Sequence, residues 1–261
     1  MESKSNSPSI DYHKIFDYKL TREELIKWRY KNFKEVTKGT KNKGRLQREM
    51  YSRKKLIIAK NAAKLISKIP TVKFVGITGA LAMNNAGKDG DIDLMIVTKS
   101  NRLWTTRLFV YLLICLFGIQ TRKPRSNTEK DRLCLNMWMD ENDLIWDKKD
   151  RNLYTAHEIA QIMPLVNRNK TYERFLYLNK WILNFWPNAV RIYDTGSRIK
   201  EKNKNLTSYI LYLISLPSEY LAFRLQYFYM KSKITREIVT PTRAIFHPND
   251  WSKVVIEKFS S

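Results

Sequence analysis

The chain has 261 residues, enough for one large domain or two smaller ones, and 43% of them are hydrophobic, which excludes an intrinsically disordered protein. Its 48 Lys and Arg residues outnumber 25 Asp and Glu, and the formal charge of +23 favours polyanionic partners, RNA or DNA first among them. The chain has only two cysteines and shows no amino-terminal signal segment, so we expect a cytoplasmic protein rather than a secreted one.

Residues 1–70 are predicted to form a basic helical region. Thr21 and Glu24 are spaced as a capping box at the start of a helix over residues 22–33, because each side chain can accept a hydrogen bond from the other residue's backbone N–H. A second helix over residues 45–69 carries an apolar stripe. A degenerate helix-turn-helix that binds nucleic acid is one interpretation of this region, and a solvated basic surface is the other.

Residues 71–150 are predicted to form a small sheet. Apolar segments indicate strands at 72–78, 92–98 and 132–139, and a helix at 102–117 lies between the second and third strands. This helix has few charges, so we expect it to be buried. Its apolar run is about half as long as a membrane-spanning helix requires, and we predict no membrane span.

Two acidic residues, Asp91 and Asp93, mark the start of the second strand. Side chains two residues apart on a strand point to the same face, so the two carboxylates should repel each other unless a cation lies between them. Mg²⁺, or Mn²⁺ in its place, suits such a site because carboxylates and substrate phosphates bind it together. At the end of the first strand, Gly79 allows close approach of a phosphate, and backbone N–H groups near Ala80 can bind phosphate oxygens. An ordinary turn that carries two acids is the alternative interpretation.

This segment resembles the nucleotidyltransferase superfamily typified by DNA polymerase beta. The matching residues are Thr78-Gly79-Ala80 and Asp91-Ile92-Asp93-Leu94, separated by residues 81–90. More widely, the segments FDYKLTREEL, TGALAMNNA, RLCLNMW, LYTAHEIAQ and FHPND are similar to uncharacterised prokaryotic proteins with a nucleotidyltransferase domain. The resemblance implies an α+β fold in which a small mixed sheet forms the nucleotidyltransferase core, flanked by helical amino- and carboxy-terminal regions. It also implies that Asp91 and Asp93 are catalytic metal ligands.

The chain departs from the superfamily pattern at two positions. Ala80 replaces the usual Ser, which removes a hydroxyl contact to phosphate but leaves the backbone donors in place. The superfamily also has a third carboxylate on a later strand, where this chain has Asn136. An amide oxygen can coordinate a cation, but it cannot act as a base. We expect Asn136 to be the third metal ligand, and Asp140, four residues later, is the alternative.

Residues 151–261 are predicted to be helical, with helices at 155–163, 171–186 and 208–230. Pro217 and two charged residues interrupt the last segment, which favours a pair of soluble helices, although a role at a membrane surface stays open.

The histidines of this chain are not expected to bind a metal. His157 and Glu158 begin a zinc-protease-like pattern, but position 161 is Gln rather than His. We interpret the pair as a helix surface, and His13 lies close to an end that we expect to be frayed.

We therefore predict a metal-dependent nucleotidyltransferase. It would transfer a nucleoside monophosphate from a nucleoside triphosphate to an acceptor hydroxyl on RNA, a protein or a small molecule. A catalytically weakened module that binds nucleotides or nucleic acid is the alternative, and the enzymatic half of a toxin–antitoxin pair is a third hypothesis.

Overall fold

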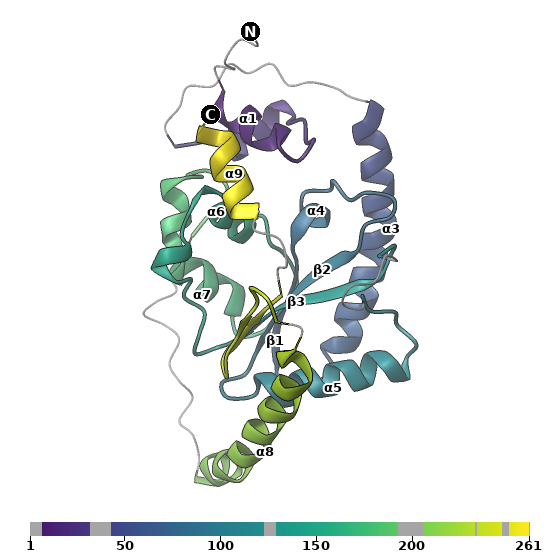
Figure 1. The fold of residues 1–261 in the computed structure, drawn as a ribbon, viewed down its shortest axis with the longest axis vertical. Coiled ribbons are helices and arrows are strands. Elements are labelled where there is room, and N and C mark those ends of the chain that lie inside the picture. The colour runs from purple at the N-terminus through teal and green to yellow at the C-terminus, as the bar shows by residue number, and fades with distance from the viewer. Residues whose placement is uncertain are drawn as a thin grey trace.

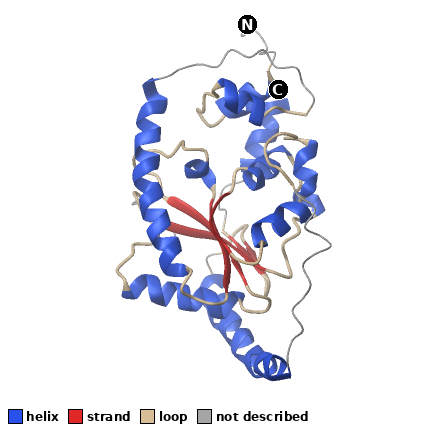
Figure 2. Ribbon diagram, turned by 180° about the vertical axis from the view of Figure 1, so that it is seen from behind, coloured by secondary structure: helices blue, strands red, loops and turns tan. Residues whose placement is uncertain are grey.

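The structure, a computed structural model, describes residues 7–31, 43–122, 129–192, 206–232, 234–246 and 251–260. It is an α+β protein in which an open mixed sheet of six strands lies between helices (Figures 1 and 2). The described helices are α1 (Pro8–Lys14), α2 (Arg22–Lys27), α3 (Lys43–Ile66), α4 (Gly79–Ala82), α5 (Leu103–Leu116), α6 (Leu153–Ala160), α7 (Thr171–Leu178), α8 (Leu206–Lys231) and α9 (Trp251–Ser260), with 3-10 turns η1 (Lys148–Asp150) and η2 (Lys180–Asn184). The strands are β1 (Val72–Ile77), β2 (Ile92–Thr98), β3 (Leu133–Asp140), β4 (Met163–Asn167), β5 (Ile238–Val239) and β6 (Arg243–Ile245).

The centre of the sheet agrees with the prediction. The strand order is β4-β1-β2-β3-β6-β5, and β2 pairs with β1 antiparallel and with β3 parallel. Asp93 stands opposite Cys134, and Met95 stands opposite Met137. One residue of β2 therefore faces two of β3, which is a β-bulge, a feature that often re-aims a side chain beside a functional site. The strands predicted at 72–78, 92–98 and 132–139 are confirmed.

The edges of the sheet were not predicted. β4, β5 and β6 all come from residues 151–261, so the helical prediction for that region is incomplete. β4 contains Pro164 and β5 has only two residues, and each lies at an edge of the sheet. A proline is tolerated in an edge strand because its missing N–H leaves no central ladder bond unmade.

Several helix ends differ from the expected ones. The capping box of Thr21 and Glu24 is confirmed at the start of α2. That helix nevertheless ends at Lys27 instead of continuing to residue 33, and Lys31 has a left-handed backbone with φ of 49°. The pair of helices expected near the carboxy terminus is wrong, since α8 continues through Pro217 as one helix.

Two apolar clusters pack on the two faces of the sheet, and each contains residues of different helices. Side chains of β2 alternate between the clusters, because Met95 and Val97 join one while Leu94 and Ile96 join the other. The first cluster includes residues of α1, α6, α7 and α9, and the second includes residues of α3, α5 and α8. Asp93 lies two residues before Met95 on β2, so its side chain points to the same face of the sheet. This is the face that α1, α6 and α9 cover.

The prediction that the helix at 102–117 is buried is only half right. One face of α5 is buried, including Trp104, Val110 and Ile114, whereas Phe109 and Leu116 on the other face are 58% and 82% exposed. Within the part of the chain that the structure describes, none of the helices combines the length and apolar character that crossing a membrane requires.

Candidate functional site

A pocket of about 470 Å³ lies where the start of β2 faces α1, α6 and α9, within the usual size range of small-molecule sites. It brings together all five residues that the sequence predicted for the site: Gly79, Ala80, Asp91, Asp93 and Asn136. The structure therefore places these residues in one pocket, while their roles stay predictions.

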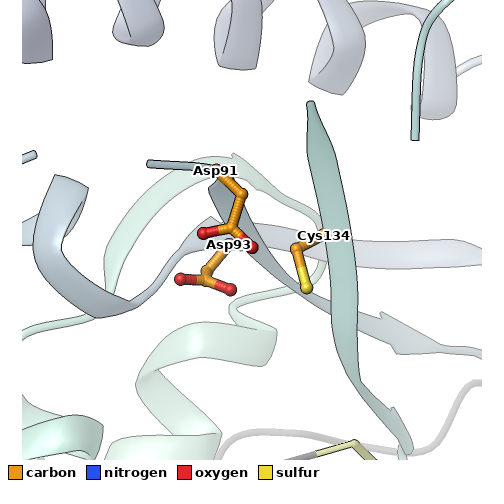
Figure 3. Close-up of side chains that lie close together, drawn as sticks. All are labelled: Asp91, Asp93 and Cys134. Atoms are coloured by element: carbon orange, nitrogen blue, oxygen red, sulfur yellow. The ribbon is translucent and has the colours of Figure 1, made fainter. Parts of the chain in front are cut away.

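The two aspartates lie side by side, as their spacing predicted. Figure 3 shows both carboxylates at the start of β2, with the Cys134 thiol approaching from β3. Oxygens of Asp91 and Asp93 and the sulfur of Cys134 all lie within 4.8 Å of one another. Arg122 partly neutralises this cluster, since its Nη1 donates to Asp91 Oδ2 at 2.9 Å.

Asp93 is the acid whose pKa is shifted. Burial and, to a smaller extent, the neighbouring Asp91 carboxylate together raise its pKa to about 7. Asn136 Nδ2 donates to Asp93 Oδ1 at 2.7 Å and holds this carboxylate in place. A carboxylate whose charged form is disfavoured by burial and by a second acid gains most from a cation placed beside it.

Gly79 shapes the wall next to Asp93. Its φ is +60°, a conformation that L side chains rarely adopt, and a Cβ built on it would lie 2.6 Å from Asp93 Oδ2. Glycine is therefore required here by both the backbone and the neighbouring carboxylate. Ala80 follows it in the short helix α4 and is exposed toward the pocket.

Strand alternation places Cys134 and Asn136 on the pocket face of β3, and the β-bulge brings Met137 to that same face. Leu135 and Asn136 together stand opposite Leu94, and the apolar cluster on the far face of the sheet takes Leu135 while Asn136 lines the pocket. Cys134 lies two residues before Asn136 on the same face, a signal in the strand alternation that sequence reasoning missed. Burial raises the pKa of the Cys134 thiol, which therefore stays protonated.

Two buried polar atoms that line or adjoin the pocket have no hydrogen-bond partner: Thr78 Oγ1 and Asn136 Oδ1. Unsatisfied buried acceptors of this kind are costly, and a bound ion or water is the usual explanation. The set of two carboxylates and an amide oxygen is a hard oxygen donor set, which fits Mg²⁺ or Mn²⁺. A protonated thiol adds nothing to such a site.

Asp140, the alternative to Asn136, does not line the pocket. Its carboxylate is fully buried at the end of β3 and accepts hydrogen bonds from the backbone N–H groups of Asn101 and Asn142. Burial raises the pKa of Asp140 to about 6. Its role is structural, because it joins the end of β3 to the loop before α5.

A further carboxylate, Glu158, lines the pocket from α6. Burial and, to a smaller extent, the charge of Asp93 together raise the pKa of Glu158 to about 8. Gln161 Nε2 donates to Glu158 Oε1 at 2.6 Å. The interpretation of His157 and Glu158 as an exposed helix surface is therefore wrong, because α6 turns this face toward the site.

His13, which we expected to lie close to a frayed end, is buried in the same wall. Its Nδ1 donates to the Ser9 carbonyl at 2.7 Å, so its Nε2 accepts from His157 Nε2 at 3.1 Å. His157 stacks on Trp28 with ring centroids 4.1 Å apart. Burial lowers the pKa of both histidines, that of His13 to about 4, and the neutral pair fastens α1 to α6.

Comparisons with known proteins do not identify a family for this chain. No protein-family model matches it, and neither the curated proteins nor the solved structures include a significant match. The structure shows an α+β protein with an open mixed sheet of six strands. Its resemblance to nucleotidyltransferases stays a prediction that rests on the residues of the site.

Proposed function

We propose that this protein is a metal-dependent nucleotidyltransferase, which transfers a nucleoside monophosphate from a nucleoside triphosphate to an acceptor hydroxyl. The main supporting observation is that Asp91 and Asp93 meet in one pocket. Gly79 lies against the Asp93 carboxylate, and the Asn136 amide donates a hydrogen bond to it. Metal-dependent phosphate chemistry is supported in two ways. One is the residue spacing that suggested the superfamily, and the other is the three-dimensional arrangement of these side chains.

Asp91, Asp93 and Asn136 are the residues that would hold Mg²⁺ or Mn²⁺. Such ions neutralise phosphate charge and favour ionisation of the attacking hydroxyl. The carboxylates supply the negative charge, and the Asn136 amide, anchored by its donated hydrogen bond, presents a free oxygen. The soft thiol of Cys134 stays protonated and leaves the site to oxygen ligands.

Three further pocket residues, Arg48, Arg122 and Glu158, have defined tasks in this proposal. Arg122 and Arg48 are the cations on the pocket wall, suited to contact phosphate oxygens. The acceptor oxygen attacks the α-phosphorus, the bond from that phosphorus to the bridging oxygen breaks, and pyrophosphate leaves. In its ionised form Glu158 would accept the hydroxyl proton, since a pKa of about 8 lets this carboxylate exchange a proton near neutral pH.

The direct test incubates the protein with labelled nucleoside triphosphates, Mg²⁺ or Mn²⁺ and a cell extract. Transfer of label should require the divalent ion and should be lost in the double variant Asp91→Ala with Asp93→Ala. Asp89→Ala is the matched control, because Asp89 is an exposed acid of the same loop and does not line the pocket. Absence of transfer, or equal transfer by the double variant, would refute the proposal.

A binding module with weakened catalysis is the second candidate, and two observations favour it. Asn136 replaces the third carboxylate, and Arg122 already supplies a cation to Asp91. Such a module would bind nucleotides or RNA in a salt-dependent way without turnover. Glu158→Gln separates the two candidates, since only an enzyme should lose transfer while its nucleotide affinity stays the same.

A further inference from the structure

The end of the molecule farthest from α1 and α9 consists of α5 and α8 (Figures 1 and 2). Both helices expose large apolar side chains there, each 44% to 83% exposed. We call this set the α5–α8 patch: Leu108, Phe109, Leu112, Leu116 and Phe117 on and after α5, and Tyr220, Leu221, Leu225 and Phe228 on α8. An exposed apolar surface of this extent normally marks an interaction site.

Side-chain hydrogen bonds hold α5 and α8 together beside the patch. Glu219 of α8 accepts hydrogen bonds from the backbone N–H groups of Trp104 and Thr105, at 2.6 and 2.9 Å, and so caps the start of α5. Gln226 accepts from Arg107 at 2.6 Å and donates to the Trp104 carbonyl at 2.8 Å. The exposed apolar side chains therefore belong to two helices that are packed together.

The charge around the patch has one sign. α5 contains no acidic residue, and the only acidic residue of α8 is Glu219, which is buried. The stretch of α3 from Met50 to Ile66 also lacks acids, and α3 packs on α5. The exposed charges on these three helices and just after α3 are cations: Arg53, Lys54, Lys60, Lys64, Lys68, Arg224 and Lys231. Lys68 Nζ lies 5.8 Å from the centre of the Phe117 ring, so this cation lies at the edge of the patch.

We propose that the α5–α8 patch binds the surface of an anionic lipid bilayer. A bilayer offers an apolar layer beneath anionic headgroups, and a helix surface with leucine and phenylalanine beside lysine and arginine complements both. A nucleic acid would leave the aliphatic side chains in water, and a second copy on the same patch would bring like charges together. Membrane binding leaves the pocket facing away from the bilayer, because α1, α6 and α9 lie at the other end of the molecule. The inference does not depend on the proposed transfer activity.

Vesicle flotation of the full chain tests this proposal. The protein should float with vesicles of phosphatidylcholine and phosphatidylglycerol in equal parts and remain unbound with phosphatidylcholine alone. Leu225→Ser with Phe228→Ser should lower the partition coefficient about 100-fold, since each apolar side chain that enters the bilayer contributes about 10-fold. Lys60→Gln with Lys64→Gln should lower it about 25-fold, at about 5-fold for each cation near the surface.

Matched variants control for loss of folding and for charge alone. Ile26→Ser removes a side chain on α2 that is 56% exposed, and Lys148→Gln with Lys149→Gln removes two exposed cations of η1. Both should bind vesicles like the wild type. Binding that is absent, or that falls equally in the control and patch variants, would overturn the proposal. A dimer that light scattering detects in the wild type and that Leu225→Ser with Phe228→Ser dissociates would also overturn it, because the patch would then be a contact between copies.

Discussion

Replacing Gly79 with alanine should damage the site far more than the fold. The new Cβ would lie 2.6 Å from Asp93 Oδ2, a distance that forces the carboxylate to move. That oxygen is the end of a side chain that borders a pocket, so the carboxylate can rotate away at small cost in stability. The rotation would break the 2.7 Å hydrogen bond from Asn136 and separate Asp93 from Asp91.

Gly118→Ala is the matched control for the backbone. Gly118 follows α5 with φ of +64°, and a Cβ there would meet nothing within 4 Å. Both substitutions place alanine in the left-handed region, which costs about 1–2 kcal/mol of unfolding free energy. Only Gly79→Ala adds the contact with Asp93. Comparison of the two variants therefore isolates the effect of that contact from the backbone strain.

Urea denaturation and Mn²⁺ titration measure the two effects separately. Gly79→Ala should lose only about 1 kcal/mol more unfolding free energy than Gly118→Ala, from the broken hydrogen bond. Mn²⁺ affinity should fall about 10- to 100-fold in Gly79→Ala alone, as expected when a group that positions a metal ligand is disturbed. A Gly79→Ala variant that binds Mn²⁺ like Gly118→Ala would refute the claim that Gly79 positions Asp93. Wild-type protein that binds no Mn²⁺ would instead refute the metal site itself.

Three more predictions concern the acids and the amide around the pocket. Asn136→Asp should lower the melting temperature without metal, because it replaces the hydrogen bond to Asp93 with repulsion, and added Mg²⁺ should stabilise this variant more than the wild type. Asp140→Ala should cost about 1–3 kcal/mol in urea denaturation, since two buried N–H groups lose their acceptor, without a change in Mn²⁺ affinity. Because burial raises the pKa of Glu158 from 4.5 to about 8, the folded chain keeps a proton that the unfolded chain releases, and stability falls as pH rises between these values, by at most about 1.4 kcal/mol per pH unit. The unfolding free energy of Glu158→Gln relative to the wild type should therefore rise over pH 4.5 to 8, and a difference that is constant with pH would contradict the assignment.

The parts of the fold that depend on local pattern were predictable. β1 and β2 are continuous apolar segments bounded by a glycine turn, and the spacing of Asp91 and Asp93 alone placed both carboxylates on one face. The capping box of Thr21 and Glu24 is likewise a local motif, and the structure confirms it. These features need no knowledge of the rest of the chain, which is why the sequence predicted the part of the site that lies between β1 and β2.

The rest of the site depends on long-range packing. Glu158 and His13 belong to short amphipathic helices, and only the docking of α1 and α6 over the sheet turns these side chains toward the pocket. The β-bulge that leaves both Asn136 and Met137 on one face of β3 exists only in the pairing of β3 with β2. α5 shows the converse problem, since a helix without exposed charges is indistinguishable by sequence from one buried on all sides.

The charge of the pocket adds a constraint on the proposed function. The chain as a whole has a formal charge of +23, yet Asp91, Asp93 and Glu158 line the pocket with Arg48 and Arg122 as its cations. A triphosphate brought near by the basic surface would meet three acidic side chains, of which Asp91 and Asp93 would hold a divalent ion, so it should bind well only after that ion is bound. Metal and nucleotide should then bind cooperatively, each raising the affinity of the other by the same factor. Arg122, which pairs with both Asp91 and Glu129 in the structure, is the side chain that the ion would displace from Asp91, and its Nη1 could then contact phosphate.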